Sequence, residues 1–185
     1  MTDVQIGKHI KRIRRQRKLT LEFVGESTGF TKAYISLIES GKKLPPIATL
    51  SKIAHVLNVD IGAFFNQNKT EDEITLVRRE ERKTVVRDGT AFGYQYEAIA
   101  PLKRRKKMEP FIITHPPNLP ETNMRVDHEG EELFFVLEGK INVFYGEKKY
   151  CLRKGDSIYF NSGIPHRSEG VGNKPAKALA VIYQS

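Results

Sequence analysis

The sequence predicts a multidomain α + β protein, in which a bundle of five helices precedes a domain of short strands. Two observations predict this fold class: apolar residues recur at helical spacing as far as Phe65, and many short apolar segments separated by turn signals follow residue 73. At 185 residues the chain is long enough for two small domains. The polar segment 66–73 carries no periodicity, so we expect domains 1–68 and 69–185.

Three of the expected helices flank a central pair. The first carries isoleucines at positions 6, 10 and 13, with seven basic side chains between residues 8 and 18. A later helix over 48–59 places apolar residues at Leu50, Ile53, Ala54 and Leu57, which is the i, i+3, i+4, i+7 pattern. Asp60 is then expected to cap a short last helix that runs through Phe65.

The central pair, residues 21–40, reads as two short helices joined by a tight turn. Thr20 and Thr31 are placed to cap the two helices, and Gly29 occupies the turn position that requires a positive φ. Ile35 and Ile38 share one face of the second helix and can pack inward. The residues that then point outward are Lys32, Ala33, Ser36 and Leu37. A helix-turn-helix uses such a second helix to present side chains to DNA bases.

Residues 6–65 resemble the Xre-type helix-turn-helix, the family of the lambda repressor and Cro, over nearly the whole domain. The resemblance implies base-reading positions at Lys32, Ala33, Ser36 and Leu37, and phosphate contacts at Thr31, Tyr34 and Lys42. Leu37 stands where the family often has a polar residue, so it either contacts a thymine methyl group or contributes nothing. Arg14 and Glu39 match a pair that bridges the first and third helices, which implies a structural role.

The charge distribution agrees with a nucleic-acid partner. The chain has 31 Lys and Arg against 22 Asp and Glu, a net charge of +9. Residues 1–68 hold 11 basic and 5 acidic side chains, or +6, and residues 69–185 hold 20 and 17, or +3. A basic helix face is often merely solvated, but together with the motif it favours a double-stranded DNA operator, because neutralised phosphates release counterions.

Other features bear on the cellular setting. One cysteine, Cys151, excludes an internal disulfide framework and is consistent with a reducing cytoplasm. It lies in a strand-like segment, where we expect a small buried apolar group. The charged N-terminus lacks the apolar segment of a signal peptide, and the longest apolar run, 133–137, is too short to cross a membrane. These observations predict a cytoplasmic protein with no membrane partner.

The second domain is predicted to be a sandwich or barrel of short strands. The expected strands are 74–78, 84–87, 93–98, 108–114, 133–137, 140–145, 149–152, 157–160 and 176–183, with a proline-containing loop at 116–120. The basic run 103–107, KRRKK, is interpreted as a solvated hairpin turn in preference to a second phosphate contact.

Two segments of this domain, DHEGEELFFVLEGKINV and YCLRKGDSIYFNSGIPHR, resemble the two motifs of the cupin superfamily. The resemblance implies a double-stranded β-helix, a small jelly roll around a ligand cavity. Of the four metal ligands in metal-binding cupins, this chain keeps His128, Glu132 and His166, whereas Val126 stands in place of the first histidine. It also departs from the second motif at Asn161 and Gly170.

Two histidines and one carboxylate form the facial triad that holds Fe(II), Mn(II) or Zn(II). In the alternative, His128, Glu132 and His166 bind a small organic effector or hydrogen-bond one another without a metal. The acidic residues 127–132 are interpreted as a solvated strand end, although they could also favour a cationic ligand.

The sequence therefore predicts a DNA-binding transcriptional regulator, not an enzyme, whose cupin domain forms a homodimer and senses a small ligand or metal. The alternative is a non-haem iron cupin enzyme, because hydroxypropylphosphonate epoxidase resembles this chain in domain order and triad spacing. The basic, capped second helix of the motif favours the regulator, since an enzyme without a DNA partner has no use for it.

Overall fold

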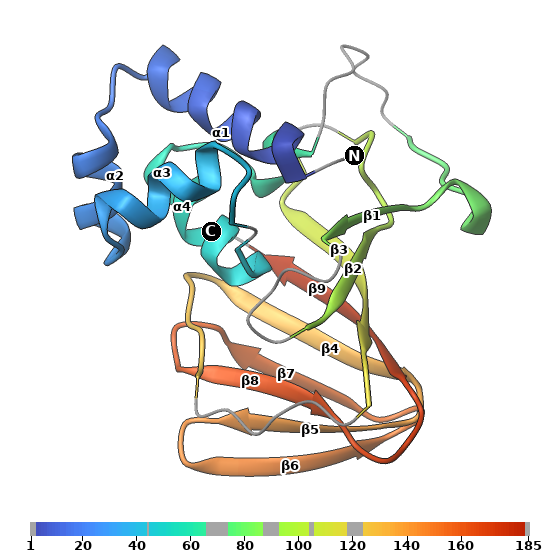
Figure 1. Cartoon of the computed structure of the whole chain (residues 1–185). Helices are drawn as coiled ribbons and strands as arrows, with labels where there is room; N and C mark the ends of the chain where they lie inside the picture. Colours follow the sequence, from blue (N-terminus) through green and yellow to red (C-terminus); the bar gives the residue numbers. More distant parts are fainter. Residues whose placement is uncertain are drawn as a thin grey trace.

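The computed structural model describes residues 3–43, 45–65, 74–86, 93–103, 106–117 and 124–183. Figure 1 shows a helical part, made from the first third of the chain, beside a two-layered β part. The expected boundary near residue 68 lies outside the described residues. No described helix is both long enough and apolar enough to cross a lipid bilayer.

The helical part contains four α-helices: α1 (Asp3–Gln16), α2 (Leu21–Thr28), α3 (Lys32–Glu39) and α4 (Ile47–Val56). Their apolar faces meet in one core, in which Ile10, Val24, Ile35 and Ile53 have no exposed surface. Helix α1 approaches the end of α3 closely at Gly7, where a Cβ atom would lie 2.3 Å from the carbonyl oxygen of Ile38. The position of α3 is therefore set by direct backbone contact with α1.

The expectation of five α-helices is wrong for the described residues, because the last of the five is a 3₁₀ turn. This element, η1 (Ile61–Phe64), spans only four residues. Its backbone bonds run from Ala63 to Asp60 and from Phe65 to Gly62, which is the i to i+3 pattern of a 3₁₀ helix. The side chain of Asp60 makes no capping hydrogen bond, so the predicted cap is also wrong.

The β part is a sandwich of two antiparallel sheets, the arrangement expected for a cupin jelly roll. The larger sheet has the order β1-β2-β3-β9-β4-β7 and the smaller one β6-β5-β8. The strands are β1 (Lys83–Val86), β2 (Gln95–Ala98), β3 (Met108–His115), β4 (Glu131–Glu138), β5 (Lys140–Tyr145), β6 (Lys148–Arg153), β7 (Ser157–Asn161), β8 (His166–Gly170) and β9 (Ala176–Tyr183).

Most strands lie where the sequence predicts them, but the structure corrects two. The segment 74–78 is not a strand: Ile74 and Leu76 are 84% and 67% exposed, and within the described part of the chain the segment does not pair with the edge strand β1. In contrast, β8 was not predicted, because its sequence HRSEG has few residues that favour strands. It forms by pairing with β5, from Ile141 opposite Gly170 to Tyr145 opposite His166.

Two single-residue expectations are also wrong. Cys151 is exposed, because it lies on the edge strand β6 and the alternation of the strand turns the neighbouring Leu152 toward the core instead. Lys106, in the basic run interpreted as a solvated turn, is largely buried and lies 2.5 Å from a carboxylate oxygen of Glu109. The middle of that run, residues 104–105, lies outside the described part of the chain.

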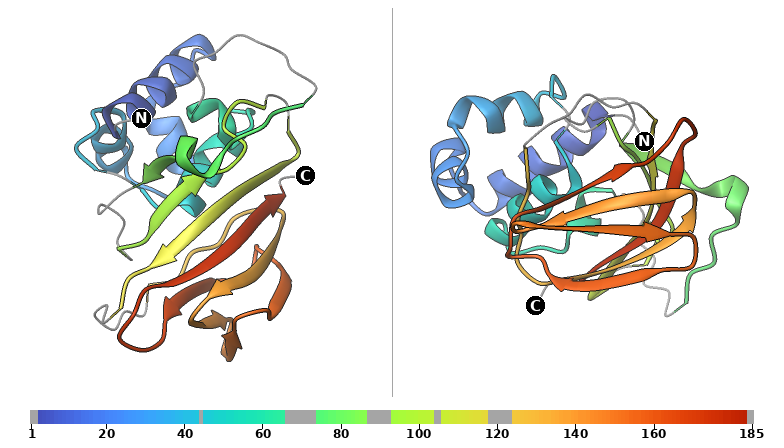
Figure 2. Two further views of the ribbon diagram at one scale, coloured as in Figure 1. Left: turned by 90° about the vertical axis from the view of Figure 1, so that its right-hand side faces the viewer. Right: turned by 90° about the horizontal axis from the view of Figure 1, so that it is seen from below.

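The helical part packs against the β3 end of the sandwich, while β5 and β6 lie farthest from it (Figures 1 and 2). Phe65 meets Phe111 of β3 edge to face, with ring centroids 6.0 Å apart. Next to this contact the Lys106–Glu109 pair lies against Gly62, where a Cβ atom would come within 2.8 Å of the Glu109 carboxylate. Burial raises the pKa of Glu109, and the charge of Lys106 opposes this rise.

Candidate functional site

The turn between α2 and α3 has the geometry that the sequence predicts. Gly29 has a φ of 76°, the left-handed conformation that glycine adopts without strain. The Thr20 hydroxyl accepts a hydrogen bond from the amide of Phe23 at 3.0 Å, and that of Thr31 accepts one from the amide of Tyr34 at 3.1 Å. Both threonines are therefore N-caps, and α3 starts at a defined residue.

One face of α3 is buried and the other is free to contact a partner. Ile35 and Ile38 are buried. The predicted base-reading residues are all exposed: Lys32, Ala33, Ser36 and Leu37. Leu37 is 41% exposed, so its apolar side chain is accessible to a partner.

Of the predicted phosphate contacts, Thr31 and Tyr34 lie at the start of α3, and Lys42 follows its C-terminal end. Thr31 and Lys42 are exposed, whereas Tyr34 is half-buried and packs on Phe30 with ring centroids 5.2 Å apart. Burial raises the pKa of Tyr34, and a hydrogen bond with Thr49 opposes the rise. The ammonium group of Lys43 lies 5.9 Å from the centre of the Tyr34 ring. Thr31 therefore lies at the helix end that carries partial positive charge, and the ammonium group of Lys43 reaches the first turn of α3 at Tyr34.

A buried ion pair locks α3 onto α1. The Arg14 guanidinium donates to both carboxylate oxygens of Glu39, at 2.6 and 2.9 Å, and a third donor reaches the carbonyl of Leu19 at 2.8 Å. The hydrogen bond to Glu39 raises the pKa of Arg14, so the guanidinium keeps its charge at neutral pH. Arg14 and Glu39 therefore connect the first and third helices, as the sequence predicts.

The three predicted metal or effector residues converge inside the sandwich. His128 precedes β4, Glu132 lies on β4, and His166 is the first residue of β8. Their ligand atoms all lie within 4.8 Å of one another, and all three side chains are buried. A carboxylate oxygen of Glu132 lies 3.5 Å from Nε2 of His128 and 3.7 Å from Nε2 of His166.

In both histidines of the triad, the hydrogen bond made by Nδ1 determines whether Nε2, which faces Glu132, can act as a metal ligand. Nδ1 of His128 lies 3.1 Å from the carbonyl oxygen of Glu129, and Nδ1 of His166 lies 2.9 Å from that of Ile164. A carbonyl oxygen only accepts, so each Nδ1 carries a proton, and the neutral form of such a ring presents an Nε2 lone pair. Burial lowers the pKa of His166, although the charge of Glu132 opposes this, and the neutral form is thereby favoured.

Val126 occupies the position of the missing cupin ligand, where it makes backbone hydrogen bonds instead of binding a metal with its side chain. It forms an isolated β-bridge with His166, in which each amide donates to the other residue's carbonyl at 2.9 and 2.8 Å. The next contact, from the amide of His128 to the carbonyl of Ser162 at 3.0 Å, fixes the segment before β4. These backbone bonds hold both histidines in place.

The cavity beside the triad is small. It has a volume of about 50 Å³ and lies between the start of α4, at Pro46–Ala48, and the inner strands. That space accommodates an ion with a few water molecules. It does not accommodate an organic ligand of ordinary size, which needs several hundred Å³. Helix α4 therefore closes the triad cavity from the side of the helical part.

The same interior holds polar residues that the sequence did not indicate. His115 has no exposed surface, and its Nε2 lies 2.8 Å from the hydroxyl of Ser168. Burial lowers the pKa of His115 to about 4. Tyr94 and Tyr96 line the triad cavity, and Tyr94 donates to the carbonyl of Ser168. The only signal in the sequence is the strand alternation, which does not distinguish a polar inward residue from an apolar one.

Two of the acidic residues near the triad remain partly exposed to solvent, as predicted, and also contact α4. Asp127 lies 2.7 Å from the ammonium group of Lys52, and Glu129 lies 3.1 Å from Nδ1 of His55. The two residues that flank His128 therefore both contact the helical part.

Taken together, an exposed, capped second helix and a triad inside a jelly roll define a helix-turn-helix protein with a cupin domain. Family models agree: the Helix-turn-helix family, HTH_3, matches residues 10–64, and the Cupin domain family, Cupin_2, matches residues 111–182. The HTH-type transcriptional regulator PuuR of Escherichia coli (strain K12) is 31% identical over 160 residues, which cover 86% of this chain and 84% of that protein. The chain belongs to the Xre-type helix-turn-helix regulators with a C-terminal cupin domain and is a DNA-binding transcriptional regulator.

Two further similarities bear on the finer assignment. The crystal structure of an HTH_3 family transcriptional regulator from Vibrio cholerae has a TM-score of 0.70 and 27% identity, and the match covers 100% of this chain and 98% of that one. The (S)-2-hydroxypropylphosphonic acid epoxidase of Streptomyces wedmorensis is 28% identical over 185 residues, covering 94% of this chain and 93% of the enzyme. The domain order is therefore shared by regulators and by an enzyme.

Proposed function

We propose that residues 1–68 bind a specific DNA operator with α3 in the major groove. The exposed face of α3 supports base contacts by Lys32, Ala33, Ser36 and Leu37, and the groups that flank this helix support phosphate contacts by Thr31, Tyr34 and Lys42. The observation that carries this assignment is the buried Arg14–Glu39 pair, because it holds an exposed helix rigidly on the domain. A face without a partner would not need such fixed positioning.

The cupin domain, residues 69–185, is proposed to form the homodimer. One helix-turn-helix module buries little DNA surface, so useful affinity requires two copies. The edge strands β6 and β7 each present an unpaired side to a second copy. Two recognition helices on one DNA face would then read half-sites roughly 34 Å apart or a multiple of that distance.

His128, Glu132 and His166 are proposed to hold a divalent metal: Fe(II), Mn(II) or Zn(II). Two Nε2 lone pairs and a carboxylate converge on one point, and with both Nδ1 protons donated outward none of the three supplies a proton there. A cation satisfies all three, and the carbonyls of Glu129 and Ile164 supply the outer hydrogen bonds that metal-bound histidines require. Such an ion would serve as a structural or sensing ligand of the cupin.

The enzyme alternative rests on the relationship to the epoxidase, for which a crystal structure with Fe(II) is known. The cavity that borders all three triad residues speaks against it, because 50 Å³ is too small for an organic substrate beside the ion, and the neighbouring pocket of about 370 Å³ reaches His128 but neither Glu132 nor His166. We therefore propose a regulator that senses a ligand through its cupin domain, without turnover.

One paired experiment tests these assignments. Genomic fragments and random DNA are compared in mobility-shift assays at physiological salt, while the metal content of the purified protein is measured by mass spectrometry. The proposal expects at least one fragment bound more tightly than random DNA and close to one equivalent of metal per chain. Equal binding to all DNA contradicts the operator, and oxygen consumption with a hydroxypropylphosphonate and Fe(II) supports the enzyme instead.

A further inference from the structure

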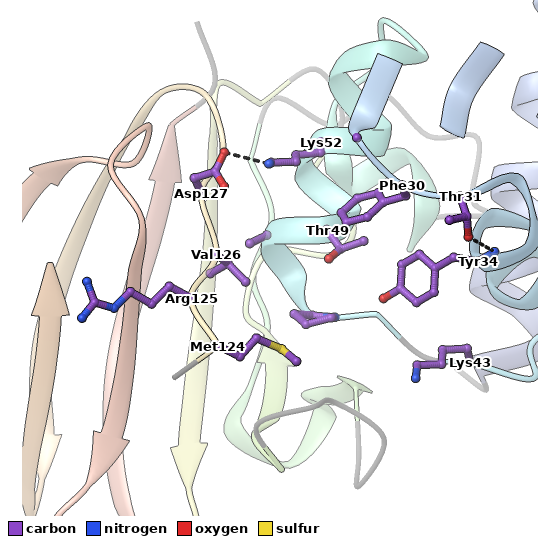
Figure 3. Close-up of a pocket in the computed structure, with 13 residues that line it drawn as sticks. Phe30, Thr31, Tyr34, Lys43, Thr49, Lys52, Met124, Arg125, Val126 and Asp127 are labelled. Carbon is purple, nitrogen blue, oxygen red and sulfur yellow. Dashed lines mark hydrogen bonds and ion pairs between the residues drawn. The ribbon is translucent and has the colours of Figure 1, made fainter. Parts of the chain in front are cut away.

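A second cavity, ten times larger than that of the triad, lies between the helical part and the cupin. It has a volume of about 520 Å³, compared with about 50 Å³ beside the triad. Figure 3 shows that its walls come from the start of α3, from α4 and from the segment before β4. We call it the interdomain pocket; among the residues that line it are Phe30, Tyr34, Lys43, Thr49, Met124 and Val126.

The two cavities are neighbours with different capacities. Pro46, Ala48 and Val126 line both of them. A volume of 520 Å³ falls within the range of sites for small organic molecules, roughly 300–1,000 Å³, and the triad cavity does not. An organic effector therefore fits the interdomain pocket rather than the triad.

The walls indicate the chemistry of its ligand. The tilted ring pair of Phe30 and Tyr34 offers aromatic surface on one side, and the side chain of Met124 points into the space from the other (Figure 3). Aromatic and thioether groups pack well on flat rings. Met124 is 51% exposed although it is apolar, so a bound molecule would cover surface that water now meets.

The charges around the pocket leave one cation in excess. Lys52 is neutralised by Asp127 at 2.7 Å. Arg125 points away from the pocket in Figure 3 and donates to the carbonyl of Gly146. Lys43 contacts the ring of Tyr34 and has no carboxylate partner within the described part of the chain. A ligand with a negative group would pair with it.

We propose that the interdomain pocket binds a small organic anion with a flat apolar body, and that this ligand competes with DNA. The competition follows because Thr31 and Tyr34 line the pocket and are also proposed phosphate contacts. This second part rests on the proposed function, whereas the binding site itself does not.

Two fluorescent dyes test the site in the full-length protein: 1-anilinonaphthalene-8-sulfonate and the uncharged N-phenyl-1-naphthylamine, which share one ring system. The sulfonate is expected to bind more tightly than the uncharged dye. Lys43→Gln should weaken only the sulfonate, roughly fivefold, the effect of an exposed ion pair. Lys42→Gln, a change of the neighbouring exposed lysine that does not line the pocket, is the matched control.

A blocking variant locates the dyes. Met124→Trp fills the pocket from an exposed position and should abolish binding of both dyes, while Tyr150→Trp on the edge strand β6 should leave binding intact. Circular dichroism confirms that the variants fold. If Met124→Trp binds the dyes as wild type does, the interdomain pocket is not their binding site. If Lys43→Gln weakens both dyes equally, the pocket does not select for a negative charge. If Met124→Trp changes only the oligomeric state, the pocket is a contact between copies and the proposal fails.

The competition is measured separately, by fluorescence anisotropy of a bound genomic fragment during titration with the sulfonate dye. Release of DNA by wild type but not by Met124→Trp supports it. If dye and DNA bind at the same time, the proposed competition is refuted, but the proposed binding site is not. If the protein binds no DNA, the proposed function fails, and the dye results still decide whether the site exists.

Discussion

The Arg14–Glu39 pair makes a quantitative prediction about the stability of the helical part. The two side chains are 10% and 4% exposed and share two charged hydrogen bonds. Removing one partner leaves the other charge buried without compensation, which costs about 3–5 kcal/mol. Replacing both by apolar residues removes the desolvation cost along with the attraction, and such exchanges are often neutral.

We therefore expect Arg14→Met and Glu39→Met each to lower the free energy of unfolding by about 3 kcal/mol or more, and the double variant to lose less than either single one. The chain has no tryptophan, so unfolding in urea is followed by circular dichroism at a helical wavelength, which reports on α1–α4. If the two single losses simply add in the double variant, the pair is not coupled, and the reasoning from its geometry is refuted. An unchanged stability of Glu39→Met contradicts it as well.

Three further predictions concern DNA, metal and pH. Lys32→Ala should relax or weaken sequence recognition, by about 1–3 kcal/mol if it contacts a base, whereas Lys42→Ala should weaken all sequences alike and reduce the salt slope in a binding titration. The double variant His128→Ala with His166→Ala should fold and still bind DNA but lose its metal, as measured by mass spectrometry; retained metal contradicts the triad. His115 has a pKa of about 4 when folded against 6.5 ordinarily, so its contribution is fully present above pH 6.5 and is lost as the pH falls toward 4. This loss amounts to about 3 kcal/mol at most and should be absent in His115→Gln, as judged from urea unfolding at several pH values.

The sequence predicted the parts of the molecule that depend on local rules. The caps at Thr20 and Thr31 and the positive φ at Gly29 follow from backbone chemistry within a few residues. The convergence of His128, Glu132 and His166 was implied by the resemblance to the cupin motifs, because that jelly roll brings fixed strand positions together.

The parts that failed depend on tertiary neighbours. Strand β8 owes its existence to β5, since its own residues do not favour a strand. Residues 74–78 alternate as a strand would, but their apolar side chains Ile74 and Leu76 find no core to pack against and stay exposed. The burial of Lys106 and His115, and the interdomain pocket, arise where segments far apart in sequence meet, and no local pattern indicates them.

The placement of His128 between Asp127 and Glu129 has a thermodynamic consequence. One ligand of the triad is held in a three-residue interval whose outer members both contact α4, through Lys52 and His55. A ligand that moved His128 would therefore also strain or relax these two contacts with α4, and any such linkage is reciprocal. By whatever factor an ion at the triad alters the affinity for the operator, the operator must alter the affinity for the ion by the same factor, so that each promoter would set its own threshold for the signal.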